Sequence, residues 1–447
     1  MSTLFIKNAT IVNEGEEFVG SLVVKNGKIE DVFKGDISFS DENAAVIDAT
    51  GLHLLPGMID DQVHFREPGL THKANIRTES RAAVAGGITS FMEMPNTKPA
   101  VLTQELLENK FQIGHKTSLA NFSFFMGASN DNIEDVLKTN FKRVPGLKIF
   151  MGSSTGNMLV DNFNTLNNIF SKTEGLIAVH CEDEATIRAN MVKAKLEFGE
   201  NVPMSQHPII RSHESCFKSS SLAVELAKKH SSRLHVLHIS TEKELDLFVN
   251  NIDLKDKRIT SEVCIHHLSF TDSDYQSKGA FIKWNPAVKT QKDQDALWKS
   301  LLNNKLDIIA TDHAPHTLLE KDNAYFSCPS GAPMVQHALP MMLEHTLSNK
   351  ISIEQVVEKM CHAPAICFNI EKRGFIREGY YADLVAVKPH ANWKVDRSNI
   401  LYSCGWSPLE DKVFNFQVLK TIVNGNVVYD NGKILNKYCG KELRFHN

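Results

Sequence analysis

The sequence predicts an α/β protein: a (β/α)8 TIM barrel with a small β-sandwich domain formed by the N- and C-terminal segments. In the middle of the chain, eight apolar, strand-like runs alternate with helix-like segments. Five of these runs end close to a histidine, lysine or aspartate, as barrel strands do at an active-site face. Both ends of the chain are rich in β-type runs around an Asn-Gly pair.

The two ends of the chain have matching patterns. Asn26-Gly27 lies inside SLVVKNGKIEDVF, and Asn424-Gly425 lies inside LKTIVNGNVVYDNGK. Asn-Gly between apolar alternations predicts a tight β-hairpin. We therefore expect one small sheet domain made from residues 1–54 and 370–447, which encloses a barrel at residues 55–369.

The barrel prediction depends on the order of strands and helices. The expected strands are 53–64, 88–95, 121–127, 146–152, 176–181, 234–240, 259–267 and 307–313. The expected helices include 80–85, 131–139, 214–230 and 293–302. In the third of these helices, Leu222, Ala223, Leu226 and Ala227 form one apolar face. A doubly wound sheet is the alternative, but it would not bring residues from strands 1, 4, 5, 6 and 8 around one point.

Composition restricts the class of protein. Of the 447 residues, 42% are apolar and 23% are charged, which favours a large core over disorder. The net charge of −4, without a basic run, disfavours nucleic acid or a membrane surface as a partner. The eight cysteines are scattered without a C-x-x-C pair, so we expect reduced thiols in a cytoplasmic protein. We expect neither a signal peptide nor a membrane-spanning helix.

The first expected barrel strand carries three polar residues on one face, Gln62, His64 and Arg66. Polar groups on a buried strand face are costly unless they have partners. A lone histidine there is more often a hydrogen-bonded core residue than a ligand. His180 and His238 close two further apolar strands, however, and together the three histidines predict a site for zinc or another first-row divalent metal.

Asp312 and Lys148 also end expected strands. Asp312 follows the run DIIAT, and we interpret it as a carboxylate that contacts the metal and moves a proton. A turn or capping role is the alternative, because Pro315 follows closely. Lys148 by itself indicates only a lysine whose amine reaches solvent from a strand end.

The sequence resembles the cyclic amidohydrolases, and among them the dihydroorotases, over nearly its whole length. The motifs that carry the resemblance are PGMIDDQVHFREPG, AGGITSFMEMPNTKP, GLKIF, AVHCED, LHVLHISTEKE, ITSEVCIHHL, KWNPAV, ATDHAPH and GFIREGYYADLVAV. The resemblance implies reversible cyclisation of N-carbamoyl-L-aspartate to L-dihydroorotate in pyrimidine (UMP) biosynthesis. It also implies one or two zinc ions as cofactor.

The resemblance also implies roles for individual residues. Lys148 would be N-carboxylated and bridge two zinc ions, one held by His180 and His238 and the other by His64 and Asp312. The residues expected to bind substrate are Arg66, Asn96, Asn285 and His316. For His266 and His267 we expect structural or supporting roles.

Two features depart from the family pattern. Gln62 stands where the family has a histidine, and an amide oxygen is a weaker zinc ligand than an imidazole. The metal beside His64 and Asp312, with Gln62 as its third ligand, is therefore expected to be weakly held or absent. The stretch SGAPMVQHALP also departs, so no substrate contact is carried over to it.

Two other functions remain open. One is a different cyclic amide hydrolase, an allantoinase or hydantoinase, although Arg66 and Asn96 suit a substrate that bears a carboxylate. The other is an inactive subunit that supports a partner such as aspartate transcarbamoylase, for which Gln62 is the only support. For the enzyme we expect a small-molecule substrate and a homo-oligomer, a dimer.

Overall fold

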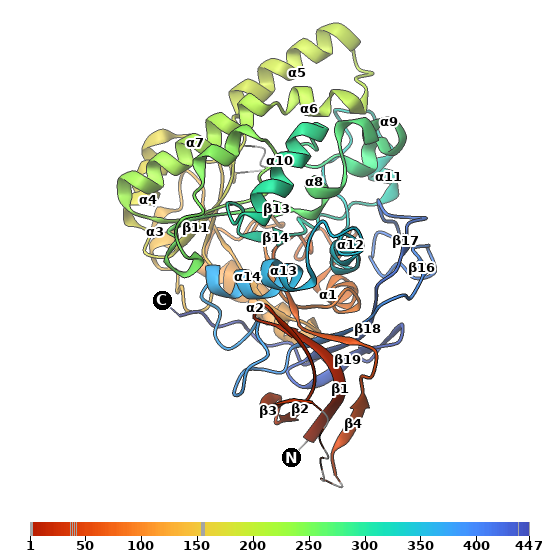
Figure 1. Cartoon of the computed structure of the whole chain (residues 1–447). Helices are drawn as coiled ribbons and strands as arrows, with labels where there is room; N and C mark the ends of the chain where they lie inside the picture. The colour runs from red at the N-terminus through yellow and green to blue at the C-terminus, as the bar shows by residue number, and fades with distance from the viewer. Residues whose placement is uncertain are drawn as a thin grey trace.

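The computed structural model describes residues 3–35, 37, 39, 41, 43–152, 157–436 and 438–446. It confirms a TIM barrel with a small β-sandwich domain built from both ends of the chain. In Figure 1 the β domain lies at the bottom, and helices α5 and α6 project at the opposite end. Residues 1, 2 and 447, at the outer limits of the predicted β domain, lie outside the described residues.

Eight parallel strands form the barrel, as predicted. They are β6 (Met58–Val63), β7 (Ile88–Glu93), β8 (Asn121–Phe124), β10 (Leu147–Phe150), β11 (Leu176–His180), β12 (Arg233–Val236), β13 (Ile259–Cys264) and β14 (Ile308–Ala310). Between β8 and β10, the short strand β9 (Met126–Gly127) pairs with β10. The barrel closes where the His64 main-chain N–H donates to the His313 carbonyl at 2.7 Å.

Several predicted strands are longer than the observed ones, and two of them extend into an element outside the barrel sheet. The run 53–64 is two strands, because β5 (His53–Pro56) joins the small sheet and only β6 joins the barrel. Gly57 separates them and donates its N–H to the Asp383 carbonyl at 2.8 Å. The run 259–267 ends at Cys264, and helix α8 (Ile265–Ser269) follows directly. Short apolar runs do not by themselves distinguish a strand from a buried helix.

The four predicted helices are present, with longer or shorter bounds. They are α1 (Ile76–Ala85), α3 (Ile133–Leu137), α7 (His213–His230) and α10 (Gln291–Leu302). In α7 the predicted apolar face is buried at Ala223, Leu226 and Ala227, and the Ser212 hydroxyl caps the first turn. The other helices are α2 (Gln104–Thr117), α4 (Phe163–Lys172), α5 (Glu184–Phe198), α6 (His207–Ile210), α9 (Tyr275–Lys278), α11 (Leu318–Lys321), α12 (Ala338–Glu344), α13 (Ile353–Val357) and α14 (Ala363–Cys367).

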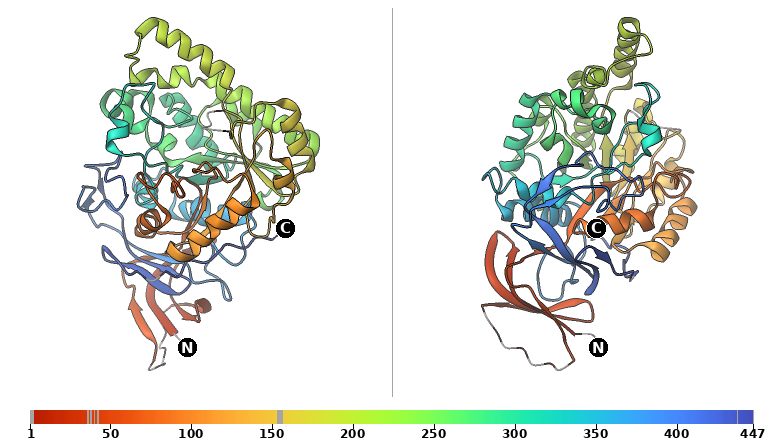
Figure 2. Two further views of the ribbon diagram at one scale, coloured as in Figure 1. Left: turned by 180° about the vertical axis from the view of Figure 1, so that it is seen from behind. Right: turned by 90° about the vertical axis from the view of Figure 1, so that its right-hand side faces the viewer.

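The small domain has one hydrogen-bonded path of strands, in the order β20-β19-β18-β15-β5-β1-β2-β3, with β4 paired to β1. Its strands are β1 (Thr3–Asn13), β2 (Glu16–Lys25), β3 (Lys28–Lys34), β4 (Ala45–Asp48), β5, β15 (Leu384–Lys388), β18 (Gln417–Val423), β19 (Asn426–Asp430) and β20 (Lys433–Ile434). The N- and C-terminal strands lie together below the barrel (Figure 2). The short pair β16 (Trp393–Lys394) and β17 (Val413–Phe414) stands apart.

Both predicted Asn-Gly hairpins are confirmed. Asn26-Gly27 joins β2 to β3, and Asn424-Gly425 joins β18 to β19, with positive φ at all four residues. The two turns touch, because a Cβ atom on Gly27 would lie 2.6 Å from the Asn424 carbonyl oxygen. Only glycine therefore fits at this contact between the two ends of the chain.

Apolar side chains line the base of the barrel, at the end opposite the predicted site. Ile59, Ala178 and Ile308 belong to one buried cluster with Phe368 and Phe445, from the end of α14 and the C-terminal segment. The side chains predicted to carry the chemistry lie at the opposite end, where the carboxyl ends of the strands meet. None of the described helices is long and apolar enough to cross a membrane.

Candidate active site

A small cavity of about 90 Å³ lies at the carboxyl ends of the barrel strands. The predicted site residues that line it are Gln62, His64, Arg66, Asn96, Lys148, His180, His238, Asn285 and Asp312. His316 lies just behind this wall, 3.1 Å from Arg66. Barrel closure thus brings all ten predicted residues together, although they are spread over more than half of the chain.

His180 and His238 form a close pair. His180 Nδ1 lies 2.9 Å from His238 Nε2, and His180 Nε2 lies 3.0 Å from a Glu182 carboxylate oxygen. Glu182 therefore holds the Nε2 proton of His180 and leaves the Nδ1 lone pair facing His238. Burial lowers the pKa of both imidazoles, so they are neutral, which is the form that binds a metal.

His64 is oriented by Asn96 and faces Asp312. The His64 Nδ1–H donates to the Asn96 amide oxygen at 2.7 Å, and His64 Nε2 lies 3.2 Å from Asp312 Oδ1. Gln62 Nε2 donates to the same carboxylate oxygen at 3.3 Å. The Gln62 oxygen is turned the other way, towards the thiol of Cys264 at 3.6 Å. Asn96, expected to bind substrate, thus also fixes the orientation of His64.

Lys148 is a buried amine without a hydrogen bond or ion pair among the described residues. It is 1% exposed, its Nζ lies 4.6 Å from the centroid of the Phe150 ring, and the nearest charges that favour its cationic form are those of Asp312 and Glu262. Burial lowers the pKa of Lys148 to about 8. A fraction of the amine is therefore neutral near pH 7, and the neutral amine is the form that reacts with carbon dioxide to give a carbamate.

Cationic groups converge on one corner of the site. Arg66 Nε donates to the Pro315 carbonyl at 3.1 Å, and Lys73 Nζ donates to His316 Nδ1 at 3.0 Å. Burial lowers the pKa of Arg66 to about 10, which leaves it cationic at neutral pH. Of these groups Arg66 lines the cavity and offers guanidinium donors to an anion beside the candidate metal donors. Lys73 is paired with Glu320 at 2.9 Å, and burial holds the pKa of His316 well below its ordinary value.

The backbone is strained at three of the predicted residues. The backbone φ angles are 71° at Arg66, 41° at His238 and 45° at Asp312. Residues other than glycine rarely adopt this left-handed region. Such strain costs on the order of 1–3 kcal/mol per residue and is concentrated at functional sites. The turn after Arg66 needs Gly69, because a Cβ there would lie 1.8 Å from the Lys98 carbonyl oxygen.

Several lining residues were not predicted from the sequence, namely Phe150, Trp284, Ala314, Ser330 and Gly331. Ser330 and Gly331 come from the stretch that departs from the family pattern, and no sequence signal pointed to them. Asn285 was predicted, and its buried amide oxygen has no hydrogen-bond partner among the described residues. It is therefore available to a ligand.

Comparisons with known proteins agree with this geometry. Residues 53–428 match the model of the amidohydrolase family. A dihydroorotase from Methanosphaera stadtmanae is 29% identical over 99% of this chain and 100% of its own length. A dihydroorotase from Pyrococcus furiosus is 31% identical over 95% of this chain and 92% of its own. The solved L-hydantoinase (dihydropyrimidinase) of Arthrobacter aurescens superposes with a TM-score of 0.93 at 26% identity, over 99% and 100% of the two chains.

The chain belongs to the amidohydrolase family. It is an enzyme, a cyclic amide hydrolase, and the family is one that binds metal ions.

Proposed function

We propose that this enzyme is a zinc-dependent dihydroorotase that interconverts N-carbamoyl-L-aspartate and L-dihydroorotate. This reaction belongs to the cytoplasmic synthesis of pyrimidines. The proposal rests above all on the buried Arg66 guanidinium, which lines the cationic corner of the cavity beside the candidate metal donors. Dihydroorotate carries a carboxylate that this corner can hold, whereas hydantoin and allantoin have none.

The donors around the cavity fit zinc. His180 and His238 offer neutral imidazole nitrogens, and His64 and Asp312 offer a nitrogen and a carboxylate oxygen 3.2 Å apart. Lys148, buried among these donors without a hydrogen bond or ion pair to a described residue, would bridge the two groups of donors once it is N-carboxylated. Zinc held there would polarise the ring carbonyl and lower the pKa of a water molecule towards about 7. Gln62 contributes little to this set, because its amide N–H points to Asp312.

Substrate binding and proton transfer are carried out by different side chains. Arg66 holds the substrate carboxylate by its planar guanidinium, with His316 behind it and the Asn285 oxygen beside it. During ring opening, Asp312 accepts the proton of the attacking water and returns it to the ring nitrogen as the C–N bond breaks. Ring closure follows the same path in reverse, and water is released.

Turnover of three substrates by the isolated chain tests the proposal. We expect activity on L-dihydroorotate and little on hydantoin or allantoin. A preference for hydantoin, the ring acted on by the similar L-hydantoinase, would replace dihydroorotase with the second candidate function. Bound metal with no turnover of any of the three would indicate the inactive subunit.

Lys148→Ala tests the bridging role. We expect most of the metal and most of the activity to be lost, because the carbamate is the only donor shared by the two groups. Short carboxylates added without bicarbonate should restore part of both by occupying the vacated position. Full activity in Lys148→Ala would exclude the bridge.

A further inference from the structure

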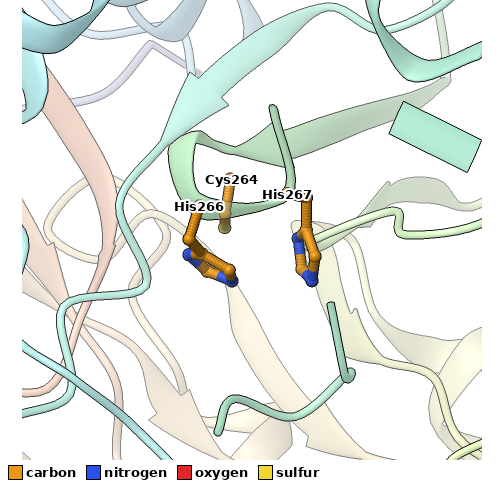
Figure 3. A group of neighbouring side chains, drawn as sticks. All are labelled: Cys264, His266 and His267. Atoms are coloured by element: carbon orange, nitrogen blue, oxygen red, sulfur yellow. The ribbon is translucent and has the colours of Figure 1, made fainter. Parts of the chain in front are cut away.

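Cys264, His266 and His267 form a second group of possible metal ligands, named here the 264–267 cluster. They lie where β13 ends and α8 begins, and all three are buried. One ligand atom from each residue lies within 4.8 Å of the other two. Figure 3 shows the three side chains leaving the same turn and facing a common space.

The imidazoles of this cluster lack the partners that buried histidines normally have. Neither ring nitrogen of His266 has a hydrogen bond of normal geometry among the described residues, and its one polar contact, with the Thr311 backbone, is a weaker one. His267 Nε2 donates to the Pro286 carbonyl at 3.1 Å, while its Nδ1 has no partner. An unpaired buried polar group costs about 1–3 kcal/mol, so these nitrogens need an explanation.

The arrangement of His267 is the one that metal-binding histidines adopt. Such histidines donate one ring N–H to a carbonyl or carboxylate, which directs the other nitrogen's lone pair to the metal. In His267 the Pro286 carbonyl takes the Nε2 proton and leaves Nδ1 as the free acceptor. His266 is held in place by stacking on Trp284, with ring centroids 4.0 Å apart and an interplanar angle of 4°.

A second buried cluster shows what a satisfied histidine looks like. His235 Nε2 lies 3.2 Å from Glu262 and 3.4 Å from Asp61, and its Nδ1 lies 2.8 Å from the Thr260 hydroxyl. Both nitrogens are used, and the neighbouring groups raise the pKa of His235 well above its ordinary value. With both ring nitrogens engaged, His235 has no lone pair left for a metal, in contrast to the histidines of the 264–267 cluster.

Gln62 links the 264–267 cluster to the proposed active site. Its amide oxygen lies 3.6 Å from Cys264 Sγ, and its amide nitrogen donates to Asp312 at 3.3 Å. Zinc bonds of about 2.3 Å to sulfur and 2.1 Å to oxygen, at tetrahedral angles, separate the two donors by roughly 3.6 Å. The observed separation, which is that of a hydrogen bond from the Cys264 thiol, therefore also matches two ligands on one zinc ion.

We propose that the 264–267 cluster binds one zinc ion of its own through Cys264 Sγ, one nitrogen of His266 and Nδ1 of His267. The Gln62 amide oxygen supplies the fourth ligand. Thiolate and imidazole donors select zinc over magnesium or calcium. On binding, the Cys264 thiol releases its proton to solvent as the sulfur–metal bond forms. The bound ion would hold the β13–α8 turn in place, and Gln62 would serve as one of its ligands.

Cobalt(II) tests this site separately from the active site. The metal-free protein is titrated with cobalt, while thiolate-to-cobalt charge-transfer absorption and bound metal per chain are measured. None of the proposed active-site donors is a cysteine, so the absorption reports Cys264. We expect the band in the natural chain, and in Cys264→Ser we expect loss of the band and of one bound ion per chain. Absence of the band from the natural chain, or its persistence in Cys264→Ser, would overturn the proposal.

Two control variants isolate the effect. Cys181→Ser removes another buried thiol, next to His180, and should keep the band. Lys148→Ala is expected to remove metal from the active site and should also keep the band. The test of the 264–267 cluster can therefore be interpreted even if the proposed function is wrong. If Cys264→Ser does not fold, X-ray absorption of the zinc-loaded natural chain decides the matter. One sulfur neighbour of zinc supports the site, and none refutes it.

Discussion

The two ends of the barrel both bury polar or charged groups, but the groups at the base have hydrogen-bond partners, whereas some at the mouth lack them in the part of the chain that the structure describes. At the base, Asp383 accepts from Arg373, from the Asn121 amide at 3.1 Å and from the Asn424 main chain at 2.8 Å. At the mouth, among the described residues, the Lys148 amine has no hydrogen bond or ion pair, and neither ring nitrogen of His266 has a hydrogen bond of normal geometry. Charges with a complete set of partners hold the two domains together, whereas buried groups without partners indicate where a ligand belongs.

The backbone shows the same difference. At the base, positive φ falls on Asn424 and Gly425, residue types that adopt it at little cost in a hairpin. At the mouth it falls on Arg66, a residue type that rarely adopts it, and on His238 and Asp312, which lie outside any hairpin turn. Positioning the side chains at the mouth thus lowers the stability of the fold. We therefore expect variants at the mouth to impair activity and variants at the base to impair folding.

Removal of the Asp312 carboxylate should have the largest effect on activity. As the group that moves the proton, its loss in Asp312→Ala should lower kcat by about 10²–10⁴-fold. Zinc content must be measured on the same sample, because part of the loss can come from weaker metal binding. Activity within a few fold of the natural enzyme would contradict the assignment.

At the base, Asp383→Ala should impair folding instead of chemistry. Arg373 is 3% exposed, and removal of its carboxylate partner leaves a buried charge uncompensated. We expect the free energy of unfolding to fall by about 3–5 kcal/mol, measured by denaturant titration. Glu16→Ala breaks the exposed ion pair with Lys34 and should cost less than about 1 kcal/mol. Equal losses in the two variants would contradict the role given to the base.

Arg66→Lys keeps the charge at the mouth and removes the planar fork. We expect kcat/KM for dihydroorotate to fall by about tenfold or more, which is about 1.4 kcal/mol of transition-state binding. Zinc content and unfolding should stay unchanged. A parallel loss of zinc and activity would instead make Arg66 a structural residue of the turn that follows β6.

Gln62→His should have the smallest effect. The histidine side chain would add an imidazole beside His64, so the more weakly held zinc there should bind roughly tenfold tighter. Dialysis of both proteins against graded chelator measures this change. Two equally tight active-site metals in the natural chain would show that Gln62 does not weaken the site. The cobalt–thiolate absorption band reports metal bound at the 264–267 cluster, so this metal can be distinguished from the active-site metals.

The sequence was sufficient where local pattern decides structure. Alternating apolar runs predicted all eight barrel strands, and the Asn-Gly pairs predicted both hairpins. It was insufficient where one apolar run serves two elements, as at Gly57 between the two sheets and at Cys264 between β13 and α8. The proposed division of the chain near residues 54 and 370 remains a prediction.

The sequence by itself determined the class of enzyme and the ten residues that meet at the mouth, because each lies in a motif or at the end of an apolar run. Only the tertiary structure decided which of these groups have partners. The thiol of Cys264 meets the amide of Gln62 across 202 positions of the chain, and His267 is completed by Pro286. Periodicity is a local property, whereas a hydrogen bond or its absence depends on which distant segments the closed barrel brings within about 3 Å.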